Sequence, residues 1–170
     1  METITDYPTL CGRFLRLPRP CVVGVEGFTG SGKSHLANAL AKDAAASVVH
    51  TDQYVTGEDA SLSYPDRLDY SRIRSAANRA TADSPVTIIE GICLREVLRR
   101  SNISARVFVY VKRLAGNGLW HDGFHLEDFE SGSTMAANLK EPHRSDFIYH
   151  SGDRPHEHAD IVFHRVEALA

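Results

Sequence analysis

The segment GFTGSGKS, residues 27–34, combines glycine, lysine and serine at a spacing that can hold phosphate. Its glycines allow backbone angles and close approach that a Cβ would block, so successive amide N–H groups can converge on phosphate oxygens. Lys33 adds positive charge near the outer phosphates, and the Ser34 hydroxyl is placed to ligate Mg²⁺. The pattern predicts a nucleoside triphosphate site formed by Gly27, Phe28, Thr29, Gly30, Ser31, Gly32, Lys33, Ser34 and His35.

Two acidic residues follow apolar runs, Asp52 after SVVHT and Glu90 after VTII. The carboxyl ends of parallel strands meet at the edge of a sheet where ligands bind, so both carboxylates are expected to face the phosphates. Carboxylates at such positions suit Mg²⁺, and Asp52 can instead accept the proton of an acceptor hydroxyl. We predict Asp52 and Lys33 as catalytic residues and Ser34, Asp52 and Glu90 as metal ligands. An ordinary turn or helix cap remains the alternative for Asp52.

Short apolar runs alternate with longer helical patterns from residue 21 onward, which predicts a parallel α/β sheet. The predicted strands are residues 21–26, 47–51, 86–89, 106–111 and 161–163, and the predicted helices are residues 34–45, 70–81 and 94–100. Residues 1–19 are expected to form a helical N-terminal extension, and the aperiodic residues 112–132 a short lid. The chain lacks repeats and linkers, so residues 1–170 are predicted to form a single domain.

Composition narrows the class of partner. With 170 residues, 42% of them hydrophobic, and a net charge of -3, the chain suits one core and argues against a nucleic-acid or anionic-membrane surface. A small-molecule partner is expected. Three widely spaced cysteines and an acidic N-terminus favour a cytoplasmic protein without a disulfide framework. The sequence is compatible with a homo-oligomer but does not determine the oligomeric state.

The remaining motifs favour one class of phosphate-loop protein. A GTPase is expected to carry an Asn-Lys-x-Asp segment, which the sequence GNGLWHDG does not supply. The larger ATPase classes need signature segments for which a chain of 170 residues has no room. A small-molecule kinase is the class that remains.

The ordered motifs resemble the uridine kinase and phosphoribulokinase family of P-loop kinases over residues 20 to about 165. GFTGSGKS is similar to the phosphate loop of that family, and HTDQYV to its Asp-x-Phe-Tyr segment. Three further blocks also agree in order with the family: SYPDRLDYSRI with its His-Pro-Asp-x-x-Asp block, VTIIEGI with its IEGI strand, and HEHADIVF with its closing Tyr-Ala-Asp-Ile-Ile-Ile strand.

The resemblance implies ATP- and Mg²⁺-dependent phosphoryl transfer to a hydroxyl of a small molecule, with Asp52 as the base. It also implies a three-layer P-loop NTPase fold, in which helices flank a parallel five-stranded sheet with the order 2-3-1-4-5. The acceptor-side residues that it suggests are Tyr54, Tyr64, Asp66 and Arg113.

Two departures keep other functions open. Ser63 stands where uridine kinases have a ribose-binding Asp, and the lid offers Lys112 and Arg113 where the family has several arginines. Arg144 or Arg154 would then have to supply charge to the site. The alternatives are a nucleotide-binding protein with little or no kinase activity and a P-loop ATPase that uses water as acceptor. The acceptor and the nucleotide base of the donor are not determined by the sequence.

Overall fold

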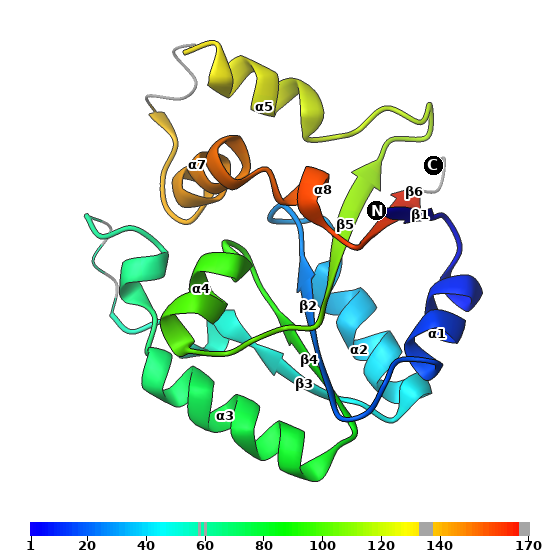
Figure 1. Ribbon diagram of the computed structural model, residues 1–170. Coiled ribbons are helices and arrows are strands. Elements are labelled where there is room, and N and C mark those ends of the chain that lie inside the picture. The colour runs from blue at the N-terminus through cyan, green and yellow to red at the C-terminus, as the bar shows by residue number, and fades with distance from the viewer. Residues whose placement is uncertain (58, 60, 133–137, 167–170) are drawn as a thin grey trace.

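The computed structural model describes residues 1–57, 59, 61–132 and 138–166 (Figure 1). Within these residues, one parallel sheet of six strands has the order β1-β6-β5-β2-β4-β3. Its strands are β1 (Glu2–Ile4), β2 (Cys21–Glu26), β3 (Ser47–His50), β4 (Val86–Glu90), β5 (Val107–Leu114) and β6 (Ile161–Val166). The expected parallel α/β architecture is therefore confirmed.

The prediction of a five-stranded sheet with the order 2-3-1-4-5 is wrong for the whole sheet, which has a sixth strand and therefore a different order. The five strands located from the sequence run β3-β4-β2-β5-β6, and β1 extends the sheet beyond β6. Strand β1 pairs through Glu2 with Ile161 and through Ile4 with Phe163. The N-terminal extension, predicted as helical, thus also contains a strand, because three residues are too few to show a periodicity.

Helices cover both faces of the sheet, which gives three layers (Figure 1). Helices α1 and α2 lie on one face, and α3 and α4 on the other. The helices are α1 (Tyr7–Leu15), α2 (Lys33–Ala44), α3 (Tyr70–Asp83), α4 (Leu94–Ser101), α5 (Gly123–Glu130), α7 (His143–Asp153) and α8 (Pro155–His158), with 3₁₀ helices η1 (Thr51–Tyr54) and η2 (Pro65–Arg67). None of the helices in the described residues is long and apolar enough to cross a membrane.

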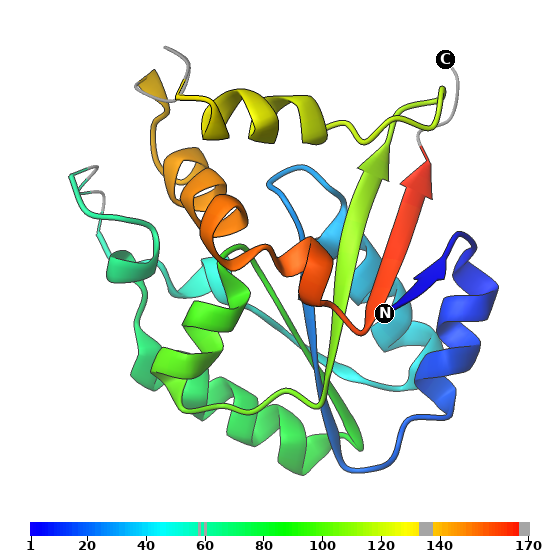
Figure 2. The same cartoon turned by 45° about the horizontal axis from the view of Figure 1, so that its top comes forward.

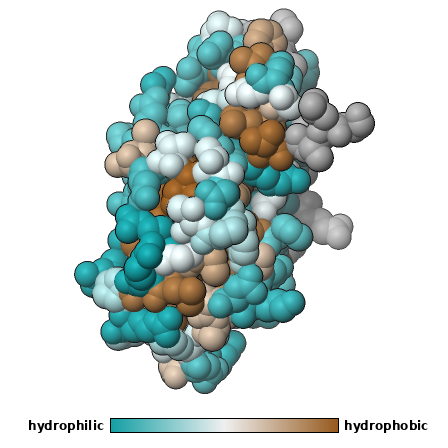
Figure 3. Space-filling model, turned by 90° about the vertical axis from the view of Figure 1, so that its right-hand side faces the viewer, coloured by the Kyte–Doolittle hydropathy of each residue, from teal (hydrophilic) through white to brown (hydrophobic). Residues whose placement is uncertain are grey.

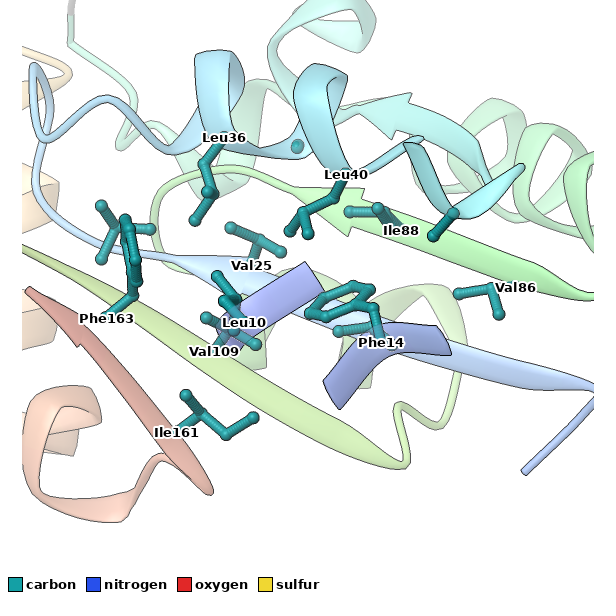
Figure 4. Packing of buried hydrophobic residues seen from close by; sticks show 14 of the residues in the cluster. Leu10, Phe14, Val25, Leu36, Leu40, Val86, Ile88, Val109, Ile161 and Phe163 are labelled. Atoms are coloured by element: carbon teal, nitrogen blue, oxygen red, sulfur yellow. The ribbon is translucent and has the colours of Figure 1, made fainter. Parts of the chain in front are cut away.

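The largest core cluster lies between the sheet and helices α1 and α2 (Figure 4). Leu10 and Leu40 from these helices are fully buried against Ile88 of β4. The neighbouring Ile89 points to the other face, where it packs with residues of α3 and α4. Because successive side chains of a strand alternate between faces, both layers of helices are fixed by the same apolar strand.

Helices α1 and α3 have a side-chain cap at the N-terminus, whereas α2 has none. Asp6 caps α1 by accepting the N–H of Thr9 at 2.8 Å, and Asp69 caps α3 by accepting the N–H of Arg72 at 3.0 Å. Helix α2 begins after Gly32, which has a φ of 92° and provides no side-chain cap. The first N–H groups of α2 are therefore left for another partner, and an anion is the partner that a helix N-terminus favours.

Helices α5 and α7 lie beyond the carboxyl ends of the strands (Figure 2). The segment predicted as an aperiodic lid, residues 112–132, is partly regular, since Lys112, Arg113 and Leu114 belong to β5 and Gly123–Glu130 forms α5. Strand β5 continues this far because β6 pairs with it up to the pair Leu114 and Val166.

The surface view in Figure 3 shows hydrophobic residues in small groups that are separated by hydrophilic ones. This pattern is the ordinary one for a globular protein, whose surface always exposes some apolar side chains.

Candidate functional site

A cavity of about 150 Å³ lies where the phosphate loop meets the carboxyl ends of β3 and β4. Its lining is formed by Thr29, Lys33, Ser34, Asp52, Tyr64, Glu90, Gly91, Ile92 and Pro142. The four predicted catalytic and metal-binding residues therefore meet in one place, although they come from separate segments. The parallel sheet explains this meeting, because β2, β3 and β4 all end at the same edge.

The phosphate loop turns sharply at glycines that no other residue could replace without movement. A Cβ at Gly27 would lie 2.6 Å from the carbonyl oxygen of Val111, and Gly32 has a φ of 92°. The turn closes with a hydrogen bond of 3.0 Å from the N–H of Ser31 to the carbonyl of Phe28. Glycine at these positions lets the chain turn tightly from β2 into α2, a conformation in which successive N–H groups can converge on an anion.

Lys33 is buried, with 9% of its surface exposed. Its ammonium group donates to the carbonyl of Phe28 at 3.3 Å, and among the described residues no carboxylate forms a salt bridge with it. Burying a charge without a counter-charge costs free energy, so the site is electrostatically prepared for an anion. The uncapped start of α2 adds the positive end of the helix dipole at the same place.

Glu90 ends β4 and is 2% exposed. One carboxylate oxygen, Oε1, lies 2.6 Å from Nδ1 of His50 at the end of β3. The other, Oε2, is buried and has no hydrogen-bond partner within the described part of the chain. A buried carboxylate oxygen without a partner at this position fits a role as a ligand of a hydrated divalent cation.

Asp52 lies in η1, directly after β3, and its side chain is exposed to the cavity. Tyr64 forms the opposite wall, with its hydroxyl 3.4 Å from the Thr51 hydroxyl. Burial raises the pKa of Tyr64, and the nearby Asp52 and Glu90 carboxylates raise it further. Tyr64 therefore stays neutral. Of the two carboxylates among the described lining residues, that of Glu90 is buried and that of Asp52 is exposed to solvent.

Helix α7 holds the phosphate loop from outside the sheet. The buried Asp146 carboxylate accepts both the backbone N–H of Thr29, at 2.7 Å, and its hydroxyl, at 2.9 Å. One turn later the His150 ring stacks on Phe28 with centroids 3.6 Å apart. These contacts fix two loop residues on one face of α7, since residues four apart on a helix lie side by side.

Helix α7 and Glu141 just before its start also contact the Tyr64 side of the cavity. The backbone N–H of Tyr64 donates to the Glu141 carboxylate and to the Ser145 hydroxyl, each at 3.0 Å. Tyr149 donates at 2.6 Å to Glu26, the buried last residue of β2, which also binds Arg95 at 2.9 Å. Helix α7 and the residues just before it thus join the phosphate loop and the Tyr64 segment into one framework.

Outside the loop segment 27–34, four of the predicted residues do not line the 150 Å³ cavity. Asp66 forms an ion pair with Arg100 at 2.6 Å and accepts from Ser63 at 2.6 Å, and the Arg100 hydrogen bond lowers the pKa of Asp66. Tyr54 packs with buried residues of α3 and α4. His35 lines a second cavity, of about 290 Å³, beside α2. The substrate roles of Asp66 and Tyr54 remain predictions.

The fourth residue, Arg113, lies beside the phosphate loop. Its Nη1 is 3.7 Å from the position that a Cβ of Gly30 would occupy. Arg165, its pairing partner on β6, donates to the carbonyl of Ser31 at 3.2 Å. The cations near the loop therefore come from the ends of β5 and β6.

Sequence reasoning did not find His50, Asp146, His150 or Arg165. Asp146 and His150 share an i, i+4 spacing, but such a pair occurs on many helix surfaces and does not indicate a target. Their contacts join residues that are far apart in the sequence; Asp146 and Thr29, for example, are separated by 117 positions. Only the fold brings them together.

Within residues 1–57, 59, 61–132 and 138–166, no group of three or more His, Cys, Asp or Glu side chains is positioned to hold a metal ion. A phosphate-bound Mg²⁺ does not need such a cage, because substrate oxygens and water supply most of its ligands.

A cluster of four rings, those of Tyr110, Trp120, His150 and His156, packs beside Phe28 of the loop. Trp120 lies 4.9 Å from the His156 ring, and Tyr110 lies 5.7 Å from the His150 ring, measured between centroids. Burial lowers the pKa of His156 most, and together with the neighbouring His150, Lys112 and Arg154 it brings this pKa to about 4, against the opposing effect of Glu157. His156 is therefore neutral at pH 7.

We expect His156 to make the fold less stable in acid. An unfolded chain binds a proton at this histidine below about pH 6.5, whereas the folded chain resists protonation until about pH 4. The stability contribution is thus present above pH 6.5 and is lost as the pH falls through this window. Replacing His156→Phe should reduce the loss between pH 7 and pH 5 by roughly 1–2 kcal/mol, measured by urea unfolding. An unchanged pH dependence in the variant would contradict this assignment.

Comparison with known proteins identifies the fold. The chain is similar to a possible uridine kinase from Bacillus stearothermophilus, with a TM-score of 0.60 and 18% identity over 92% of this chain and 96% of that chain. It is also similar to a provisionally named fructose transport system kinase from Silicibacter sp., with a TM-score of 0.53 and 18% identity over 94% and 99% of the two chains. No protein-family model and no curated protein matches the chain. These likenesses show that the chain shares the fold of these two proteins over nearly its whole length.

Proposed function

We propose that the protein transfers the γ-phosphoryl group of ATP to a hydroxyl of a small molecule. The observation that carries this proposal is the cavity in which Lys33 and Ser34 of the phosphate loop face Asp52 and Glu90 across about 150 Å³. Kinases with the same fold support the class of reaction. An acceptor hydroxyl placed in this cavity would lie between a candidate base and the bound phosphates.

In the proposed reaction, the acceptor oxygen forms a bond to the γ-phosphorus, the bond from that phosphorus to the bridging oxygen breaks, and ADP leaves with the electron pair. The proton of the acceptor hydroxyl passes to the Asp52 carboxylate. Lys33 and the N–H groups at the start of α2 stabilise the charge that develops on the phosphate oxygens. Asp146 and His150 keep the loop in place while this happens.

With Asp52 acting as the base, Ser34 and Glu90 would hold Mg²⁺, which prefers oxygen ligands of this kind. The unpartnered Glu90 Oε2 supports the fit. When bound, the ion would neutralise charge on the phosphate oxygens. His50 would keep the Glu90 carboxylate oriented through its contact at 2.6 Å.

The proposal is tested by incubating the protein with ATP and Mg²⁺ and a panel of nucleosides, sugars and other alcohols. We expect ADP release to depend on one acceptor, with a phosphorylated product seen by mass spectrometry. ADP release at one rate with every acceptor, and without any, would identify an ATPase. Nucleotide binding without either reaction would identify a nucleotide-binding protein, for which the shortage of lid arginines is the specific argument.

Asp146 is expected to act as a positioning residue for the nucleotide site. Replacing Asp146→Ala leaves the N–H of Thr29 without its acceptor, and ordering one loop residue costs about 1–2 kcal/mol, which is roughly tenfold in affinity. The ATP affinity of Asp146→Ala, measured by calorimetry, should therefore be about tenfold lower than that of the wild-type protein. The affinity of Asp146→Asn should lie between these two values, because its amide oxygen still accepts hydrogen bonds. Asp153→Ala, on the exposed end of the same helix, is the control. Equal affinity in all four proteins would remove Asp146 from the site.

We place the reaction in the cytoplasm, since the three cysteines, Cys11, Cys21 and Cys93, are unpaired.

A further inference from the structure

The charges around the acceptor side of the cavity are unbalanced. Among the described residues that line it, Asp52 and Glu90 are acidic and Lys33 is the only lysine or arginine. No lysine, arginine or histidine occurs among the residues that the structure does not describe, which are 58, 60, 133–137 and 167–170. Lys33 belongs to the phosphate loop, where its charge is engaged by the donor. The acceptor side therefore has negative charge and no cation of its own.

The remaining walls are apolar or neutral. Tyr64 and Ile92 are 4% and 7% exposed, and Pro142 closes the side near α7. Behind Tyr64 lies a further carboxylate, that of Glu141, which accepts the backbone N–H of Tyr64 at 3.0 Å. These walls cannot form the charge-assisted hydrogen bonds that a phosphate or carboxylate group on the acceptor would require.

Two arginines of α4 are engaged by carboxylates outside the cavity lining. Arg100 pairs with Asp66 and Glu96, each at 2.6 Å, and Arg95 pairs with Glu26 at 2.9 Å. No arginine lines the cavity among the residues that the structure describes. An anionic acceptor would thus enter a site where two carboxylates and the donor phosphates repel it, and one divalent cation would offset only part of this negative charge.

We propose, on the basis of the phosphotransfer function above, that the acceptor is a compact alcohol without negative charge, and that Asp52, Glu90 and the apolar wall at Ile92 exclude phosphorylated and carboxylated alcohols. The cavity volume supports a compact reacting group, since about 150 Å³ equals roughly five water molecules at ~30 Å³ each. The same electrostatics favours release of the product, because the new phosphate group is an anion with no cation of its own on the acceptor side.

The test compares each neutral alcohol with a derivative that carries one anionic group and keeps a primary hydroxyl: glycerol with glycerol 3-phosphate and glycerate, fructose with fructose 6-phosphate, and uridine with uridine 3′-monophosphate. ADP release and product mass are measured with ATP and Mg²⁺. We expect the active acceptor to be the neutral member, with its anionic partner at least 100-fold lower in kcat/KM. An anionic acceptor that works equally well or better overturns the inference and leaves the kinase proposal intact. Acceptor-independent ADP release overturns both.

A substitution at Ile92 tests whether this wall determines the preference for neutral over anionic acceptors. Ile92→Lys places a cation on the acceptor side and should reduce the ratio of neutral to anionic kcat/KM at least tenfold. Ile92→Met, with similar volume and no charge, should leave the ratio as in the wild-type protein. Circular dichroism and thermal unfolding establish that both variants are folded. A ratio that is the same in the lysine and methionine variants would exclude the Ile92 wall as the source of the selectivity.

Discussion

Replacing Asp52→Asn should reduce phosphoryl transfer by about 10²–10⁴-fold, the range that a positioned general base contributes. Asparagine keeps the shape of the side chain and can accept a hydrogen bond, but it cannot take the proton of the acceptor hydroxyl. Asp52 is exposed to the cavity and lies outside the phosphate loop, so the affinity for ATP should change little. The measurements are kcat/KM for the acceptor found in the panel and the Kd of ATP by calorimetry.

Asp69→Asn is the matched control for this variant. Asp69 caps α3 by accepting the N–H of Arg72 at 3.0 Å, and asparagine is an equally good cap. Activity should therefore be retained in Asp69→Asn. Wild-type activity in Asp52→Asn would remove Asp52 from the mechanism. A large rise in the Mg²⁺ concentration needed for half-maximal rate, with kcat restored at saturating Mg²⁺, would instead assign Asp52 to the metal.

Replacing Lys33→Met should strongly reduce transfer and also weaken nucleotide binding. A hydrogen bond to a charged group contributes about 1.5–3 kcal/mol, so the Kd of ATP should rise roughly 10–100-fold. The rate should fall further, by about 10²–10³-fold, because the ammonium also stabilises charge in the transition state. Calorimetry and the ADP assay measure the two effects separately.

The same substitution should make the unliganded protein more stable to heat. Methionine fills the volume of the lysine stem and removes a buried ammonium whose described hydrogen bond is to the carbonyl of Phe28 alone. The rise in melting temperature that ATP causes in the wild-type protein should be lost. Lys42→Met, on the exposed surface of α2, should change neither property. Undiminished ATP binding by Lys33→Met would mean that the loop does not hold the polyphosphate.

Together, these variants distinguish the three functions that fit a phosphate loop. In a kinase, Asp52→Asn loses transfer while Lys33→Met loses both transfer and binding. In a nucleotide-binding protein, only Lys33→Met has an effect, because there is no reaction for Asp52 to assist. In an ATPase, both variants affect ADP release, but no alcohol changes its rate.

Local sequence was sufficient for the phosphate loop and for the strands that end beside it. The loop is contiguous, and each of its positions is dictated by what the backbone must do, so glycine, lysine and serine indicate it directly. The apolar runs before Asp52 and Glu90 place both acids at strand ends, and strand ends of a parallel sheet share one edge. The structure accordingly brings both acids to the same cavity as Lys33.

Elements with weak local signals were predicted less well. Strand β1 has only three residues and depends on the edge of β6 for its hydrogen bonds, so its sequence contains no pattern that predicts a strand. Helix α5 buries Leu126 alone and therefore shows no apolar stripe. The strand order came from a family resemblance, and the resemblance did not include the sixth strand.

The sequence by itself thus determined the glycine-rich loop of residues 27–34, the parallel sheet and the two acids at its edge, because each depends on residues that are neighbours along the chain. Only the tertiary structure decided what supports and limits the site: Asp146 and His150 behind the loop, His50 beside Glu90, and Arg165 at Ser31. It also decided that Asp66 pairs with Arg100 instead of lining the cavity. These contacts join residues far apart in sequence, and only the packing of helices on the sheet sets the distances between them.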